Sequence, residues 1–344
     1  MKKSFFVLGV AVAALASCTN EEVVDIPQSR AIQFGTFVNH STRSSVIETT
    51  ETNFKKFFVF GSYDENSTWI PVYTNVAVNG GAVGNQTTWK PEQTAYWKAS
   101  KEYHFGAYSD GGNKLDNANF EVEKQKLTFP SYTPNNNNDL IVAIPKAVNS
   151  EENPTTNDKV GLSFQHMLSQ VKFTFKNTDS HDYNMEISDI TVSAVKATTG
   201  TATYEEEGLQ IYWDTQSGET ADYGFGTLND IAEEFSETTH TTTCFIIPQD
   251  NEQLEVSFTA TFSDNAGDIK SNKFTGKLSY QGDQEGTEKG KWTPGFKYNY
   301  TVTINGSTVD PSLDKQVIEF EVDAMKGWTD VTETPVTPKE NSGE

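Results

Sequence analysis

Residues 254–262 read LEVSFTATF, and this stretch decides the fold class. Its apolar side chains occupy every second position, at Leu254, Val256, Phe258, Ala260 and Phe262, with glutamate, serine and threonine between them. Successive side chains of a β-strand point to opposite faces of the sheet. The alternation therefore predicts a strand that buries one face and leaves the other in water.

The same period of two recurs on both sides of this stretch. It appears at 171–175, VKFTF, at 298–304, YNYTVTI, and close to the C-terminus at 318–322, IEFEV. Runs rich in glycine, asparagine, aspartate and proline separate these segments, as PNNNND does at 134–139, and such runs are typical of turns. We therefore predict an all-β protein built from antiparallel β-sandwiches.

One segment carries a helical pattern instead. In TLNDIAEEF, residues 227–235, the apolar positions fall at i, i+3, i+4 and i+7, and Thr227 with Asp230 resembles a capping box. This spacing predicts one short helix in a connection between strands.

A polar segment divides the strand patterns into two groups. Residues 146–159, KAVNSEENPTTNDK, contain Pro154 and separate two apolar strand-like stretches. We expect an N-terminal β-sandwich over residues 31–150 and a C-terminal one over 160–331. The polar end of the chain, residues 332–344, is predicted to be a mobile tail.

The first residues predict export. Two lysines precede an apolar run, residues 5–16, which is too short to span a bilayer as a helix and is typical of a signal peptide. The run ends Leu15-Ala16-Ser17-Cys18, which resembles a bacterial lipobox. We predict a signal peptide at 1–17, a lipidated Cys18 and a linker at 18–30; acyl chains on Cys18 would anchor the protein. The alternative is an ordinary signal peptide with a chance cysteine.

Charge and motifs exclude several classes of function. The chain of 344 residues carries a formal net charge of −22, which argues against nucleic acid or anionic lipid as a partner. Its five histidines show no metal-ligand spacing, and no nucleophile elbow or phosphate-binding loop is present. We expect no enzyme activity, no metal and no cofactor. His166 is interpreted as a hydrogen-bonded turn or core residue, with a ligand or pH switch as the alternative, and Cys244 as a small buried apolar residue.

An aromatic block gives the main competing hypothesis. Trp89, Tyr96 and Trp97 could line a platform for sugars, but the alternation continues through 103–107 and favours core positions. Exposure of Trp69, Trp89 and Trp97 in one line would favour a glycan-binding surface lipoprotein that stays anchored.

Several segments, taken in order, resemble the fimbrillin family of Bacteroidia, the subunits of surface pili. They are the lipobox at Cys18; the early strand with Ile32, Phe34 and Val38, followed by Thr42-Arg43; the aromatic block at 89–108; FQHMLSQVKFTF at 164–175; and WTPGFKYNYTVTI at 292–304, followed by VIEFEVDAMKGWTDV. Lys98 departs from the family pattern, since many relatives have proline there.

This resemblance implies a fold and a life cycle. The fold would be two transthyretin-like, Ig-like sandwich domains. The protein would reach the outer membrane as a lipoprotein, and a trypsin-like protease would then cut after an arginine and free the first strand. A strand from another fimbrial subunit would fill the groove, and the resulting fimbrium would support adhesion and biofilm formation through a host or bacterial surface ligand. A stalk, tip or anchor role stays open.

The matching positions assign these roles to particular residues. Cys18 would be lipidated, and Arg43 would be the cleavage site, because a cut at the competing Arg30 leaves the strand attached. The displaced strand would carry Ile32, Phe34 and Val38. From its alternation, the best donor strand contains Ile318, Phe320 and Val322.

Overall fold

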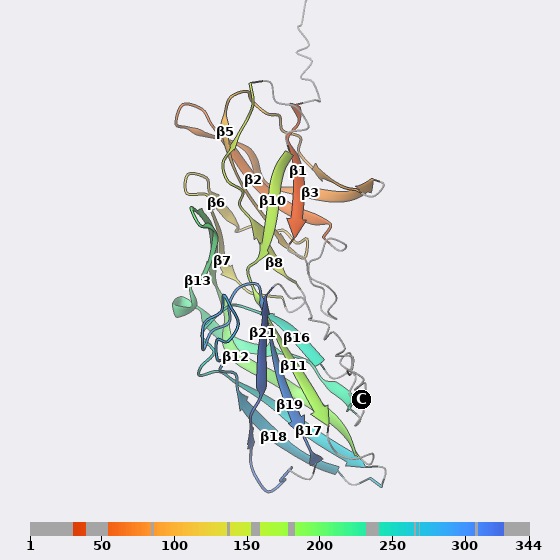
Figure 1. Ribbon diagram of the computed structural model, residues 1–344. Helices are drawn as coiled ribbons and strands as arrows, with labels where there is room; N and C mark the ends of the chain where they lie inside the picture. The colour runs from red at the N-terminus through yellow and green to blue at the C-terminus, as the bar shows by residue number, and fades with distance from the viewer. Residues whose placement is uncertain are drawn as a thin grey trace, which may run out of the picture.

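Figure 1 shows a computed structural model of the chain. It describes residues 30–38, 54–83, 86–135, 138–152, 159–177, 183–231, 241–264, 266–267, 269–306 and 309–326. Cys18, Arg43 and the predicted tail at 332–344 lie outside these residues. Within them the regular elements are β-strands and short 3-10 segments such as the turn at Thr215–Ser217, which confirms the all-β prediction. No helix in the described part is long and apolar enough to cross a membrane.

The N-terminal half is a partial barrel made from an eight-stranded sheet. The strand order is β2-β3-β4-β1-β10-β8-β5-β9, and β2 also pairs with β5, so the sheet curls back on itself. The bounds are β1 Gln33–Val38, β2 Lys56–Asp64, β3 Trp69–Val83, β4 Gln86–Pro91, β5 Glu102–Asp110, β8 Leu140–Ala143, β9 Val148–Asn149 and β10 Lys159–His166. Alternate side chains of these strands point inward and form an aromatic core that includes Phe34, Phe57, Phe105 and Phe164.

The C-terminal half is a sandwich-like pair of sheets. The four-stranded sheet has the order β16-β11-β19-β21, with β11 Ser169–Asn177, β16 Thr241–Ile246, β19 Phe296–Ile304 and β21 Glu321–Lys326. The nine-stranded sheet follows the path β20-β18-β17-β12-β7-β6, with β6 Asn119–Glu121, β7 Lys126–Tyr132, β12 Tyr183–Glu205, β17 Glu255–Asp264, β18 Ile269–Lys277 and β20 Gln316–Ile318. The strands β13 Gly208–Trp213, β14 Glu219–Gly224 and β15 Leu228–Ile231 pair with β12. Phe173, Phe258 and Tyr300 belong to the core that both sheets share.

Strands cross between the two halves (Figure 1), and a buried apolar cluster joins them. The long strand β12 pairs with β17 and β14 in its first part and with β7 and β13 in its last part. A third apolar cluster contains Tyr108 and Phe129 from the first half of the chain with Trp213 and Phe245 from the second. The domain division at 31–150 and 160–331 stays a prediction. β10, from the second range, lies in the barrel sheet, and β6 and β7, from the first range, lie in the nine-stranded sheet.

The predicted helix at 227–235 is wrong over the part that the structure describes. Residues Leu228–Ile231 form strand β15, which pairs antiparallel with β12 through Met185↔Ile231 and Ile187↔Leu228. A nine-residue segment has little helical stability of its own, whereas β12 offers it backbone partners and a core that buries Ile231 fully. Residues 232–235 lie outside the described ranges.

The expectation of purely antiparallel sheets is also wrong. Among the described strands, three pairs are parallel: β1 with β10, β11 with β19, and β18 with β20. Alternation reports which face of a strand is buried and carries no information on the direction of its neighbour.

Candidate functional site: the first strand and its seat

Strand β1 lies between β4 and β10 and completes the wall of the barrel (Figure 1). Its two sides are paired very unequally. Along β10 it forms a parallel ladder of six registered positions, from Gln33↔Lys159 to Val38↔Phe164. Toward β4 the strand ladder has one registered pair, Phe34↔Trp89. Pairing with β10 is therefore more extensive than pairing with β4. We call the sparsely paired space between β1 and β4 the seam.

The side chains of this segment fill the barrel core. Ile32 is 1% exposed and Phe34 is 3% exposed. The Phe34 ring lies 5.7 Å from Phe57, 5.8 Å from Tyr73 and 6.1 Å from Phe105, measured between ring centroids. Val38 pairs with β10 through its backbone, and its side chain lies outside the described residues. The burial of Ile32 and Phe34 is what a core-filling strand requires; the displacement of that strand stays a proposal.

A short clasp, residues 95–97, holds the chain just before β1. The Trp97 N–H donates to the Arg30 carbonyl at 2.9 Å, and the Ile32 N–H donates to the Ala95 carbonyl at 2.9 Å. An antiparallel bridge joins Ala31 to Tyr96 between these two bonds. The backbone on either side of the Arg30–Ala31 peptide bond is thus paired with the clasp.

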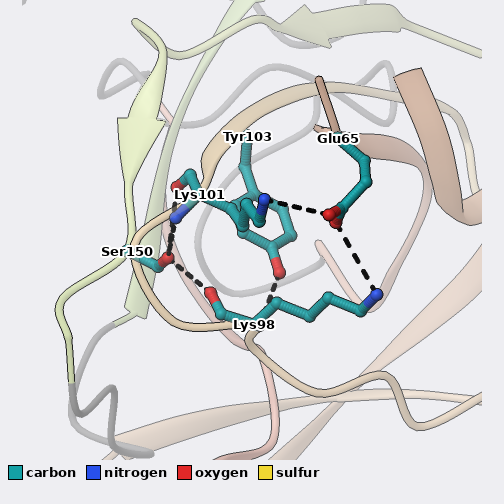
Figure 2. Close-up of polar contacts among 5 residues, drawn as sticks. All are labelled: Glu65, Lys98, Lys101, Tyr103 and Ser150. Atoms are coloured by element: carbon teal, nitrogen blue, oxygen red, sulfur yellow. Dashed lines mark hydrogen bonds and ion pairs between the residues drawn. The ribbon is translucent and has the colours of Figure 1, made fainter. Parts of the chain in front are cut away.

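The clasp is braced by a polar network at the turn that follows it (Figure 2). The Lys98 N–H donates to the Tyr103 hydroxyl at 2.7 Å, a bond that proline at this position could not make. Ser150 Oγ donates to the Lys98 carbonyl at 2.5 Å and accepts from the Lys101 N–H at 2.9 Å. Glu65 lies 3.2 Å from Lys101 Nζ and 3.9 Å from Lys98 Nζ. The departure from the family pattern at Lys98 therefore has a structural role here.

The seam between β1 and β4 contains a cavity of 530 Å³. Its lining comes from both strands, from the clasp and from the start of β10: Ala31, Ile32, Gln33, Phe34, Thr88, Trp89, Lys90, Pro91, Thr94, Tyr96 and Lys159. Nothing in the sequence pointed to this cavity, because it arises from the spacing of two strands that are far apart in the chain.

The aromatic residues considered for a sugar platform do not form one. Trp89 is 9% exposed and Trp97 is 4% exposed, and both belong to the barrel core, as the alternation predicted. Trp69 is half-buried and lies against the His104 ring, with ring centroids 4.2 Å apart. The three tryptophans therefore give no exposed line of rings.

The predicted donor segment is part of its own subunit's fold. β20 pairs in parallel with β18, and β21 pairs antiparallel with β19, so the segment crosses from one sheet to the other. Ile318, Phe320 and Val322 are partly buried against the C-terminal core. The Phe320 ring is 5.7 Å from Phe173 and 6.2 Å from Tyr300, between centroids.

A buried acidic cluster lies near the junction of the two halves. His166 Nδ1 is 2.8 Å from Asp139 Oδ2, and both side chains are almost fully buried. The Tyr132 hydroxyl donates to Asp110 Oδ1 at 3.1 Å. Burial raises the pKa of Asp110 from 3.8 to about 6, and burial also raises the pKa of Tyr132 well above its usual range. His166 is thus the hydrogen-bonded core residue that the sequence predicted, whereas its acidic neighbours were not foreseen.

Comparison with known proteins places this chain in a family. Fold and site together describe an all-β protein whose partial barrel is completed by its own N-terminal strand. The family model described as fimbrillin-like matches residues 42–323, most of the chain. The chain therefore belongs to the fimbrillin-like family. A search of curated proteins gives no match.

Solved structures from the genus Bacteroides are similar in outline. A candidate cell adhesion protein from Bacteroides uniformis has 16% sequence identity and a TM-score of 0.47, covering 88% of this chain and 98% of that chain. A candidate cell adhesion protein from Bacteroides ovatus has 13% identity and a TM-score of 0.46, covering 88% and 99%. Because both TM-scores are below 0.5, the family assignment rests on the match over 42–323. That match supports a structural or adhesive role at the cell surface rather than catalysis.

Proposed function

We propose that this protein is the structural subunit of a surface fimbrium, assembled by exchange of its first strand. The observation that carries the proposal is the position of β1 in the chain and in the barrel. β1 ends at Val38, and every other described strand begins at Lys56 or later. Among the described strands, a cut after Arg43 therefore separates β1 alone from the rest of the chain.

Backbone pairing near Arg30 favours Arg43 as the cleavage site. Arginine occurs in this chain at Arg30 and Arg43. The Arg30 carbonyl accepts from Trp97 and the Ile32 N–H donates to Ala95, so the backbone around the bond after Arg30 is paired with the clasp. Proteases favour backbone that is exposed and unpaired. The segment around Arg43, HSTRSS, is polar. Cleavage after Arg43 is thus the selective event in this proposal.

Loss of β1 would create a site for another strand. Burial of Ile32 and Phe34 stabilises the barrel by about 1.5–3 kcal/mol each. When β1 leaves, the facing edges of β4 and β10 lose their backbone partners and the core is opened to water. Such an edge is a template for strand addition. The alternating segment 316–322 of a neighbouring subunit supplies side chains of the same kind.

The lipid anchor belongs to the first stage of this cycle. Acylation at Cys18 holds the precursor at the outer membrane, and cleavage after Arg43 leaves the lipid on the peptide that contains β1. Labelling cells with a palmitate analogue tests the anchor. Label on the wild-type protein and none on Cys18→Ala is the expected result; equal labelling of both would contradict it.

The test of assembly uses an arginine-specific protease on the purified chain without its signal peptide. We expect the wild type to be cut after Arg43 and to grow in size by light scattering and electron microscopy. Arg43→Ala should stay intact and monomeric. Arg30→Ala is the matched control and should behave as the wild type. Filaments formed equally well by uncleaved Arg43→Ala would refute cleavage as the trigger.

A further inference from the structure

We propose that the seam between β1 and β4 is the docking site for the incoming donor strand, and that Lys90 and Lys159 select an acidic one. The occupant is residues 316–322 of a second copy of this chain. The inference rests on the proposed function, and it adds where exchange begins and which feature of the donor is recognised.

The seam offers a starting point that the other side of β1 does not. Along β10 an incoming strand would have to break six registered pairs at once. Toward β4 it meets the 530 Å³ cavity and one registered pair. Ile32, Phe34 and Trp89 line this cavity, so an apolar side chain entering it contacts the barrel core before β1 has left.

The charge at the seam differs from that of the whole protein. The chain has a net charge of −22, yet among the described residues that line the cavity the charged ones are Lys90 and Lys159. Both are exposed, and neither has an ion-pair partner among the described residues. β1 places the neutral Gln33 opposite Lys159, so the resident strand leaves both positive charges uncompensated.

The donor segment carries negative charges on the face opposite to its apolar side chains. In QVIEFEV, residues 316–322, Ile318, Phe320 and Val322 are partly buried, and Glu319 and Glu321 are exposed on the opposite face. If the apolar face enters the barrel, the two glutamates lie on its outer surface, as Lys90 and Lys159 do. Opposite charges on neighbouring strands attract. The exchange therefore gains charge pairs that β1 never made.

A peptide displacement experiment tests this recognition. The full chain is cut after Arg43 and mixed with a fluorescent peptide, residues 314–324, and with its Glu319→Lys/Glu321→Lys counterpart. At low salt we expect the native peptide to bind about tenfold more tightly, because two exposed charge pairs change from attractive to repulsive. The preference should fade at about 1 M salt, where charges are screened. On the double variant Lys90→Glu/Lys159→Glu the preference should reverse.

Controls separate this inference from the function on which it rests. The charge-matched variant Lys146→Glu/Lys289→Glu changes exposed lysines outside the seam and should keep the wild-type preference. If both peptides bind equally to every variant, exchange stands and selection by the two lysines is refuted. If neither peptide displaces β1 at any salt concentration, the proposed strand exchange itself fails.

Discussion

Ionised Asp110 lowers the free energy of unfolding, because its carboxylate is buried. Burial raises its pKa from 3.8 to about 6, so between these pH values the folded protein binds the proton more tightly than the unfolded chain. The stability contributed by this group is therefore highest below about pH 4, falls as the pH rises to about 6, and stays low above it.

Asp110→Asn should remove this dependence. Relative to the wild type, we expect the variant to gain about 1–3 kcal/mol at pH 7.5 and little at pH 4, because asparagine can still accept from Tyr132. Urea unfolding across this pH range measures the difference. The exposed Asp116→Asn is the control and should change stability little at either pH. A variant that loses stability at pH 7.5 would show that the charged form is favoured.

Some residue-scale features were predictable and others were not. Trp89 and Trp97 were assigned to the core, because alternation records burial directly. The Lys98 N–H bond to Tyr103 and the braces from Ser150 and Glu65 were not foreseen. Such contacts join residues up to 52 positions apart, and a local pattern holds no information about them.

At the scale of elements, the hold on β1 depends on its core side chains. In protein cut after Arg43, the peptide that contains β1 is held without a covalent link. Phe34→Ala removes a ring that contacts three others and should weaken its retention by about 3–5 kcal/mol. The peptide's dissociation rate, followed by size exclusion after cleavage, gives the measurement.

Gly35→Ala is the matched control for Phe34→Ala. A Cβ at Gly35 would have no neighbour within 4 Å, so this variant should hold the peptide as the wild type does. Equal release rates for Phe34→Ala and Gly35→Ala would mean that the ladder with β10, rather than the core, retains the strand.

Close packing of Gly276 against Phe320 offers a way to loosen the donor segment in its own subunit. A Cβ at Gly276 would lie 2.3 Å from the Phe320 ring, so Gly276→Ala must push Phe320 outward at a cost of about 1–3 kcal/mol. We expect faster hydrogen exchange in β20 and β21 and faster assembly after cleavage. Slower assembly would argue that this segment is not the donor.

The sequence predicted strands correctly where one face of the strand is buried. It failed where pairing with a distant strand determines the secondary structure or the strand direction. The alternation at 254–262 and 171–175 marked β17 and β11 correctly. The segment 228–231 had a helical spacing but became a strand, because β12 supplied backbone partners for it. The parallel ladder of β1 and β10 was missed, since strand direction depends on long connections that the local sequence does not encode.

The whole molecule combines a partial barrel and a sandwich-like pair of sheets through shared strands and a common buried cluster. β1, near the N-terminus, completes the barrel sheet. β20 and β21, near the C-terminus, are edge strands of the two C-terminal sheets. In the proposed exchange, residues 316–322 would leave their places beside β18 and β19 in one subunit and complete the barrel of another. The seam beside β1 would be the place where that replacement starts.

The N-terminus of the protein in isolated surface filaments tests this account most directly. Intact mass measurement and N-terminal sequencing of the assembled subunit should give a chain that begins at Ser44 and lacks β1. A chain in the filament that begins at a lipidated Cys18, or at Ala31 with β1 still attached, would contradict the account.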